Sequence, residues 1–254
     1  MPLKDLGSMR TRVQILSLMI INSYFLPFFK HIPFPVLNCY SCPLATNACP
    51  IGTLQHFLVI GKIPFFTIGV IGSIGSLFGR MTCGWVCPFG FLQDLVHKIP
   101  LPMKKRKIPE KYGFIKFISL ILVILGPLIF LEPFFCMICP VGTFEAGIPS
   151  VLMYGLEIGS FFYFKLAILV SIFFLMMVFS RPFCKIFCPL GAILALFNAF
   201  SRLRLKVDEG CIECGKCEKV CPMDIKVYEK PNSINCIRCL KCTEVCDHIS
   251  LVKR

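Results

Sequence analysis

The sequence predicts an α-helical membrane protein with four transmembrane helices, built as two parallel two-helix repeats and followed by a small cysteine-dense domain. Three observations predict this class. Hydrophobic residues make up 56% of the 254 residues and charged residues only 16%, a balance too apolar for a soluble domain of this length. A cysteine motif occurs twice at one fixed distance, which indicates a duplication. The polar C-terminal segment, residues 205–254, carries a dense series of the 17 cysteines.

Four apolar runs are long enough to cross the ~30 Å hydrocarbon core as helices. We expect transmembrane helices over residues 13–29, 56–78, 112–131 and 156–179. Residues 30–55 are rich in proline and cysteine, so they should form a loop or a re-entrant segment rather than a regular helix. Short amphipathic helices should follow the second and fourth spans. The expected units are a first membrane repeat (1–110), a second membrane repeat (111–204) and a C-terminal domain (205–254).

The duplicated motif contains an arginine, two cysteines, a proline and a glycine. The first copy is Arg80-Met-Thr-Cys83-Gly-Trp-Val-Cys87-Pro-Phe-Gly90, and the second is Arg181-Pro-Phe-Cys184-Lys-Ile-Phe-Cys188-Pro-Leu-Gly191. A second pair of segments also corresponds, Cys49-Pro-Ile-Gly52-Thr-Leu-Gln55 and Cys139-Pro-Val-Gly142-Thr-Phe-Glu145. The duplication therefore includes both kinds of cysteine loop.

Lys and Arg residues concentrate after the second and fourth predicted spans. They are Arg80, Lys98, Lys104, Lys105, Arg106, Lys107, Lys111, Arg181, Lys185, Arg202 and Arg204. By the positive-inside rule, both termini and the C-terminal domain should face the cytoplasm, in a multi-pass protein of the cytoplasmic (inner) membrane. The net charge of +13 is thus explained by membrane orientation, and no nucleic-acid partner is expected. Because the first and third spans run in the same direction, a pseudo-two-fold axis along the membrane normal should relate the repeats.

The C-terminal cysteines form two runs with the spacing x2, x2, x3. Three closely spaced thiolates bind three irons of one cluster, while the fourth cysteine of each run binds the other cluster. The predicted ligand sets are Cys211, Cys214, Cys217 and Cys246 for one cluster, and Cys236, Cys239, Cys242 and Cys221 for the other. Paired zinc sites are the alternative, although they typically use separated cysteine pairs. Over residues 209–247 the chain resembles bacterial two-cluster ferredoxins, which implies a small α+β domain with two [4Fe-4S] clusters.

The duplicated motif supplies a third candidate site. A pseudo-two-fold axis would bring Cys83, Cys87, Cys184 and Cys188 together, and four thiolates suit one further [4Fe-4S] cluster. Glycines at the end of each copy would let backbone N–H groups approach the sulfurs. The alternative is that these are buried structural cysteines at helix ends.

The outward-facing loops hold five cysteines, one more than a cluster needs. Cys49 and Cys139 correspond in the repeat, and Cys136 and Cys42 complete the expected set for a second membrane cluster. Cys39 is either spare or takes the place of Cys42. A disulfide between Cys39 and Cys42 is an alternative in an oxidising compartment, as are clusters that mix inner and outer cysteines. Trp85 is expected to anchor the chain at the membrane interface.

Together these motifs resemble the membrane 4Fe-4S polyferredoxins of the NapH/NosR/CcoG type, most specifically over residues 80–94, 181–191 and 211–247. The resemblance implies electron transfer between a cytoplasmic donor or acceptor and a quinone pool or partner redox enzyme. The expected partners are the lipid bilayer and redox proteins, with quinone as a further candidate. We therefore expect an electron-transfer component without catalytic residues of its own. The alternatives are a stand-alone oxidoreductase that reduces copper or oxidises quinol, and an iron-sulfur redox sensor.

Overall fold

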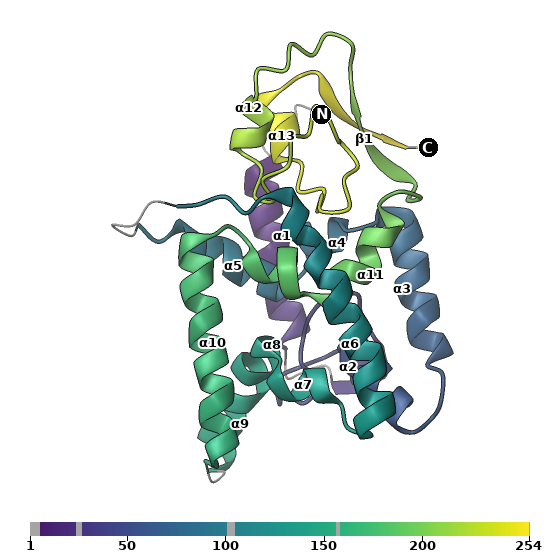
Figure 1. Ribbon diagram of the computed structural model, residues 1–254, viewed down its shortest axis with the longest axis vertical. Helices are drawn as coiled ribbons and strands as arrows, with labels where there is room; N and C mark the ends of the chain where they lie inside the picture. The colour runs from purple at the N-terminus through teal and green to yellow at the C-terminus, as the bar shows by residue number, and fades with distance from the viewer. Residues whose placement is uncertain (1–5, 24–26, 101–104, 156–157, 254) are drawn as a thin grey trace.

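The computed structural model describes residues 6–23, 27–100, 105–155 and 158–253. Helices α3 (Phe65–Phe78), α6 (Ile115–Phe130) and α10 (Ser160–Val178) follow the long axis of the molecule (Figure 1). The C-terminal segment forms one end of the molecule, which we call the C-terminal end. Shorter helices, including α2 (Pro50–Val59), lie toward the other end, which we call the far end.

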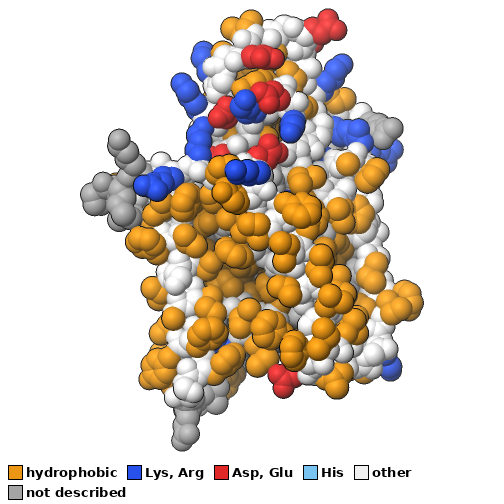
Figure 2. All heavy atoms as spheres, in the orientation of Figure 1, with side chains coloured by type: hydrophobic (Ala, Val, Ile, Leu, Met, Phe, Trp, Pro, Cys, Tyr) orange, Lys and Arg blue, Asp and Glu red, His pale blue; other side chains and the backbone are white. Residues whose placement is uncertain are grey.

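Two segments are long and apolar enough to cross a membrane. Residues Glu110–Phe130 comprise the 3-10 turn η3 (Glu110–Phe114) and α6, and residues Ser160–Val178 are α10; each has a mean hydropathy of 2.4. Only 28% and 17% of these segments are buried, whereas the core helix of a soluble protein is mostly buried. Figure 2 shows the hydrophobic side chains as a broad belt below the charged C-terminal end. This exposed apolar surface supports membrane association.

The first predicted span differs from the observed helix. Helix α1 runs over Leu6–Ile21, and a separate 3-10 turn, η2, covers Pro27–His31; residues 24–26 of the predicted span lie outside the described residues. Arg10 and Gln14 on α1 are buried and donate hydrogen bonds to the carbonyl oxygen of Gly84, at 2.8 and 3.1 Å. These polar contacts, invisible in the hydropathy profile, hold α1 against the first copy of the duplicated motif.

The second predicted span is not one continuous helix, so that expectation was wrong. Its residues are divided between α2 and α3, with a turn between Ile60 and Pro64. Gly61 has a positive φ of 71°, and Pro64 lacks the N–H that a continuing helix would need. The third and fourth predicted spans correspond to the two long segments, although Leu156, the first residue predicted for the fourth, lies outside the described residues.

The Cys-Pro steps that recur in both repeats, at Cys49, Cys87, Cys139 and Cys188, each begin a helix. The cysteine is the N-cap, with an extended backbone and ψ between 110° and 122°, and the proline occupies the first helical position, where its missing N–H costs nothing. The helices that begin in this way are α2, α5 (Pro88–Lys98), α8 (Pro140–Gly142) and α11 (Pro189–Phe197). The short turns before and after them are α4 (Met81–Trp85), α7 (Phe134–Ile138), the π-helices η4 (Thr143–Gly147) and η5 (Phe183–Phe187), and α9 (Ile148–Tyr154).

The C-terminal segment is a two-stranded antiparallel sheet with two short helices. Strands β1 (Leu203–Val207) and β2 (Ile249–Lys253) pair from Leu203↔Lys253 to Val207↔Ile249, and α12 (Lys216–Lys219) and α13 (Lys241–Val245) lie between them in sequence. Buried residues of this segment belong to the same hydrophobic cluster as those of α5, α6 and α11. The C-terminal segment is therefore packed directly onto the helical part.

Candidate iron-sulfur sites

The C-terminal cysteines come together across the two runs. Cys221, the last cysteine of the first run, lines one cavity with Cys236, Cys239 and Cys242 of the second run. Burial raises the pKa of Cys221 to about 12 and that of Cys236 to about 11, and the charge of Cys239 adds to both shifts. We call these four residues the proximal group, because they lie next to the helical part.

The other four C-terminal cysteines are more peripheral. Burial raises the pKa of Cys217, and the neighbouring charge of Cys246 adds to the shift, so these two sulfurs lie close together. Cys211 is partly exposed and Cys214 is exposed. We call these four residues the distal group; the interaction of Cys217, from the first run, with Cys246, from the second run, is consistent with the exchange between two clusters.

The duplicated motif brings four buried cysteines together, which we call the inner group. Cys83, Cys87, Cys184 and Cys188 are each at most 6% exposed. Burial raises the pKa of Cys87 and, strongly, that of Cys188, and the charges of Cys83 and Cys184 add to both shifts. The four sulfurs, which come from α4, α5, η5 and the start of α11, are therefore within electrostatic reach of one another.

The arginine side chain of each copy of the duplicated motif forms a hydrogen bond with the other copy. Arg80 donates to the carbonyl oxygen of Cys184 at 3.0 Å, and Arg181 donates to that of Cys83 at 2.8 Å. Each arginine also passes close to the glycine of the other copy: a Cβ added at Gly191 would lie 3.0 Å from Arg80, and one at Gly90 would lie 3.3 Å from Arg181. This reciprocal arrangement explains why arginine and glycine recur together with the cysteines.

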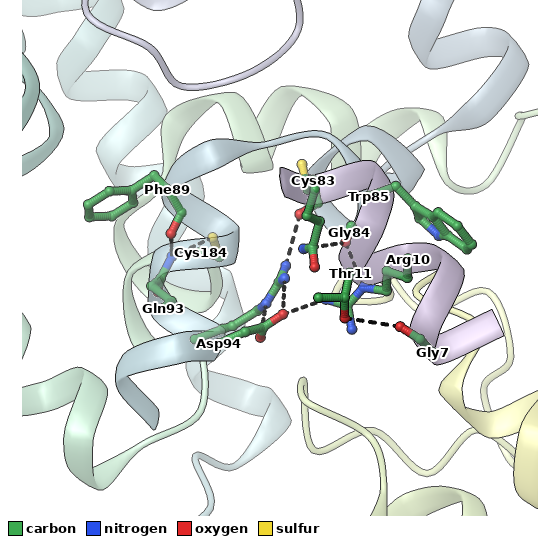
Figure 3. A network of polar contacts seen from close by, with 12 residues as sticks. Gly7, Arg10, Thr11, Cys83, Gly84, Trp85, Phe89, Gln93, Asp94 and Cys184 are labelled. Carbon is green, nitrogen blue, oxygen red and sulfur yellow. Dashed lines mark hydrogen bonds and ion pairs between the residues drawn. The ribbon is translucent and has the colours of Figure 1, made fainter. Parts of the chain in front are cut away.

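Two N–H groups point at sulfurs of the inner group. The side-chain amide of Gln93 donates to Sγ of Cys184 at 2.9 Å, and the backbone N–H of Gly191 donates to Sγ of Cys188 at 3.1 Å. Figure 3 shows Gln93 directed at Cys184 from α5. Hydrogen bonds of this kind stabilise the more negative, reduced state of an iron-sulfur cluster.

Replacing Gln93 by leucine, the residue found at the equivalent position 194 of the other copy, is expected to lower the reduction potential of an inner-group cluster. Loss of one N–H···S bond should shift the midpoint by tens of millivolts, on the order of a few kJ/mol for a one-electron couple. Redox titration followed by EPR measures the shift. Gln93→Glu, which removes the donor when ionised, should lower the potential further; an unchanged midpoint in both variants would refute the role of Gln93.

A buried carboxylate joins the arginine network. Asp94 accepts two hydrogen bonds from Arg181, at 2.7 and 2.6 Å, and one from Arg10 at 2.5 Å (Figure 3 labels Asp94 and Arg10). Burial alone would raise the pKa of Asp94, but the two guanidinium groups outweigh it and hold the pKa well below its usual range. Asp94 is therefore ionised at neutral pH and ties α1 and α5 to the second copy of the motif.

The proximal group lies directly against the inner group. A Cβ added at Gly84, between Cys83 and Cys87, would lie 2.5 Å from the carbonyl oxygen of Ile237 and 3.5 Å from Cα of Cys239. Trp85 is only 7% exposed, and its Nε1 donates to the carbonyl oxygen of Arg238 at 3.0 Å. The expectation of an interfacial Trp85 was therefore wrong: its indole is buried and bound to the backbone of the C-terminal segment.

Buried cations fasten the C-terminal segment to the helices. The guanidinium of Arg80 and the ammonium of Lys116 both donate to the carbonyl oxygen of Ile234, at 2.9 and 3.1 Å. Lys185 donates to the carbonyl oxygen of Met223 at 2.7 Å, and burial lowers its pKa although Asp224 opposes the shift. These donors are buried. Separating the C-terminal segment from the helices would therefore leave them without hydrogen-bond acceptors, which costs considerable free energy.

Four further cysteines line a cavity toward the far end of the molecule, and we call them the outer group. This cavity of about 270 Å³ is lined by Cys39, Cys49, Cys136 and Cys139. Burial raises the pKa of Cys39 to about 11 and that of Cys139 to about 12, and the charge of Cys49 adds to both shifts. Cys42 does not line this cavity; it is buried against Ala45 and Ala146.

Reciprocal contacts show that Cys39 occupies the place that corresponds to Cys136. The backbone N–H of Cys39 donates to Glu145 at 2.8 Å, and that of Cys136 donates to Gln55, which corresponds to Glu145 in the repeat, at 3.1 Å. A Cβ added at Gly142 would lie 3.6 Å from Sγ of Cys39, and one at Gly52 would lie 3.6 Å from Sγ of Cys136. Burial raises the pKa of Glu145 to about 8, so at neutral pH its side chain is largely uncharged, as Gln55 is.

The donor sets fit iron-sulfur clusters better than single metal ions. All 17 cysteines are free thiols. Within the described ranges, no three His, Cys, Asp or Glu side chains surround a point that one ion could occupy. A [4Fe-4S] cube binds each cysteine through a different iron, so its four ligand sulfurs stand farther apart than those around one zinc ion. The four buried thiols of the inner group, which are costly to ionise without a bound cation, suit such a cluster.

Some residues of these sites were not recognised from the sequence. Gly84, Gln93 and Asp94 lie within the segment 80–94 that carries the family resemblance, but their roles could not be inferred, because they depend on contacts with residues more than 80 positions away. Gln55 and Glu145 did carry a signal, since both occupy the same position after a Cys-Pro step. The correspondence of segments 49–55 and 139–145 already paired them, but it did not indicate that each binds the backbone N–H of a cysteine.

Comparison with known proteins identifies the family of the chain. The family described as "4Fe-4S binding domain" matches residues 46–65, 61–109, 113–148 and 161–208. An uncharacterized protein of Methanocaldococcus jannaschii is 32% identical over 72% of this chain and 76% of its own length. The methylamine utilization ferredoxin-type protein MauN of Methylobacillus flagellatus is 29% identical over 71% of this chain and 62% of its own.

More distant relatives are also redox proteins by name. The ferredoxin-type protein NapH of Haemophilus influenzae is 25% identical over 61% of this chain and 51% of its own length. No solved structure matches the chain. The family matches cover more than half of the chain and include both copies of the duplicated motif. The chain therefore belongs to the NapH/NosR-type polyferredoxins, a family of 4Fe-4S binding proteins of the electron-transfer type.

Proposed function

We propose that the chain is a membrane electron-transfer subunit that passes electrons between a cytoplasmic donor or acceptor and a quinone pool or partner redox enzyme. The observation that carries this proposal is the contact of Gly84 with the backbone of Ile237 and Cys239. This contact leaves no room even for a methyl group between the loop of the inner group and the loop of the proximal group. Two ligand sets in such close contact, with buried surroundings that exclude water, suit electron transfer between them.

The cluster ligands that we propose are drawn from the four groups described above. When bound, [4Fe-4S] clusters supply one-electron reduction and reoxidation, and burial and N–H···S bonds tune their potentials. The distal group has the exposed Cys214 and is best placed to meet a soluble partner. The proposed ligands are Cys211, Cys214, Cys217 and Cys246 (distal), Cys221, Cys236, Cys239 and Cys242 (proximal), Cys83, Cys87, Cys184 and Cys188 (inner), and Cys39, Cys49, Cys136 and Cys139 (outer).

We also propose a multi-pass topology in the cytoplasmic membrane, with the C-terminal end in the cytoplasm. Lys and Arg side chains gather around that end in Figure 2, above the hydrophobic belt. Figure 1 shows α4, α5 and α11, which carry most of the inner group, beneath the C-terminal segment, and α2, α7 and α8, which carry most of the outer group, nearer the far end. This arrangement supports a path for electrons from the cytoplasmic surface into the membrane.

The proposal is tested on the full chain, purified without oxygen. Iron and acid-labile sulfide should reach about 12 to 16 atoms per chain, since each cluster holds four irons and three or four sites are filled. After reduction, EPR spectra should show magnetic interaction between clusters, because the inner and proximal groups are in contact. A preparation that holds zinc instead of iron, or clusters that remain magnetically isolated when fully reduced, would overturn the proposal.

A further inference from the structure

A strongly basic cavity lies beside the proximal group, outside all four cysteine sites. Its volume is about 320 Å³, and Cys221 and Pro222 form part of its wall. Its other walls come from the end of α5, the segment 105–107, the residue Ser180 just after α10, and the starts or ends of α12 and α13. The cations that line it are Lys98, Lys105, Arg106, Lys107, Lys219 and Lys241.

The acidic residues in the wall are bound mainly by cations from outside the cavity, although the charge of Lys241 also acts on Asp94. Asp94 is engaged by Arg181 and Arg10, and Oδ2 of Asp224 accepts hydrogen bonds from Lys185 at 3.1 Å and from the N–H of Ile108 at 3.3 Å. Arg181, Arg10 and Lys185 are not among the lining residues. The carboxylates are thus already paired with cations from elsewhere, and the cavity keeps its positive charge.

Within the part of the chain that the structure describes, three of the six lining cations have no fixed partner. Lys107 forms an ion pair with Glu218 at 3.1 Å, and Lys105 donates to the carbonyl oxygen of His97 at 2.5 Å. Over the described residues, the side chains of Lys98, Arg106 and Lys219 make neither a hydrogen bond nor an ion pair. Several like charges held around one concave space repel one another, and a bound anion would relieve this repulsion.

The position of the cavity relative to the membrane indicates which kind of anion can bind in it. The backbone of Arg106 pairs with the chain at the end of α10, where its N–H donates to the carbonyl oxygen of Val178 at 3.0 Å. Since α10 is one of the two helices long enough to cross a membrane, its end marks the level of the lipid head groups. Clusters of four to eight Lys and Arg at this level are typical of sites for anionic lipids.

We propose that this cavity binds the phosphate group of an anionic membrane lipid, such as phosphatidylglycerol. The inference rests on the proposed membrane orientation. A lipid bound here would link the end of α10 to α12 and α13, and its negative charge would lie next to Cys221. The fraction of anionic lipid in the membrane would thus change the negative charge that lies next to the proximal group.

The test compares two triple variants of the full chain in nanodiscs of phosphatidylcholine with increasing phosphatidylglycerol. The first variant is Lys98→Gln, Arg106→Gln and Lys219→Gln. The control is Lys206→Gln, Lys226→Gln and Lys230→Gln, which changes the net charge equally at exposed positions that do not line the cavity. Native mass spectrometry measures how much phosphatidylglycerol each protein retains, independently of its cluster content.

The first variant should retain the anionic lipid on the order of 100-fold less tightly, about fivefold for each cation removed, while the control stays close to the unchanged protein. Equal retention by the two variants would overturn the proposal. If inorganic phosphate at millimolar concentration displaces the lipid, the site is one for soluble phosphate and the lipid assignment is wrong. Iron content, measured in parallel, should be the same in all three proteins, so loss of lipid binding is separated from any failure of the electron-transfer proposal.

Discussion

Replacing Cys39 by serine is expected to remove four irons from each chain, whereas replacing Cys42 by serine should leave the iron content unchanged. Cys39 lines the outer cavity with Cys49, Cys136 and Cys139, and Cys42 does not. Cys39 is also held as Cys136 is, by a side chain at the equivalent position of the other repeat. A [4Fe-4S] cluster that loses one of four thiolate ligands is commonly lost or converted to a smaller cluster, so the two substitutions should differ sharply.

The two variants form a matched pair, because they lie three residues apart and remove the same atom. Iron and acid-labile sulfide analysis and the EPR spectrum of the reduced protein measure the outcome. The signals of the distal, proximal and inner groups should persist in both variants. If Cys42→Ser loses the four irons and Cys39→Ser keeps them, Cys42 is the ligand that the spacing of the sequence first favoured. If neither loses iron, the outer group holds no cluster.

The sequence was most informative where a feature depends on the type and spacing of residues that are close together in the chain. The two apolar segments 110–130 and 160–178 follow from hydropathy alone, and the family follows from the Cys-Pro motifs. The spacing x2, x2, x3 also grouped Cys221 with Cys236, Cys239 and Cys242, and these four residues line one cavity. That they bind one cluster stays a prediction. Each of these features depends on residues close together in the chain or on a motif with a single known geometry.

The sequence was less informative where burial reverses the usual preference of a residue. Trp85 resembles an interfacial anchor by type, but the C-terminal segment covers it. Arg10 and Gln14 interrupt an apolar run at its start, and their partner is a carbonyl group 70 or more residues away. The break between α2 and α3 depends on Gly61 and Pro64, whose effects a hydropathy average conceals. Long-range polar contacts of this kind leave no periodic signal.

The choice between Cys39 and Cys42 shows the same limit. Counting from Cys49 places neither cysteine at the position that corresponds to Cys136, because the first repeat carries Thr46 there. The irregular segment before α2 folds back and brings Cys39 to that place, with its N–H bound by Glu145. Cys39 and Cys136 thus occupy equivalent positions in the structure, although they do not correspond when the two repeats are aligned in sequence.

Replacing Asp94 by asparagine is expected to cause a large loss of stability. Asp94 pairs with Arg181 and Arg10, whose side chains are 0% and 4% exposed. Removing the carboxylate charge leaves two buried guanidinium groups without a counter-charge, a change that typically costs about 3–5 kcal/mol. For a chain of this size the apparent midpoint of thermal unfolding should fall by roughly 10 °C. The inner group should be affected as well, because Arg181 also holds the carbonyl oxygen of Cys83.

The control for this prediction is Glu229→Gln, which removes one negative charge from an exposed pair with Lys226. Its effect should be within about 0.5 kcal/mol, since exposed ion pairs contribute little. The pKa of Asp94 is depressed, so its stabilising contribution is present above the ordinary carboxylate pKa of about 4 and is lost only as the pH falls below it. The difference between Asp94→Asn and the unchanged protein should therefore be constant between pH 6 and 8, as thermal unfolding under anaerobic conditions can measure. Equal midpoints for Asp94→Asn and Glu229→Gln would show that the two guanidinium groups do not depend on this carboxylate.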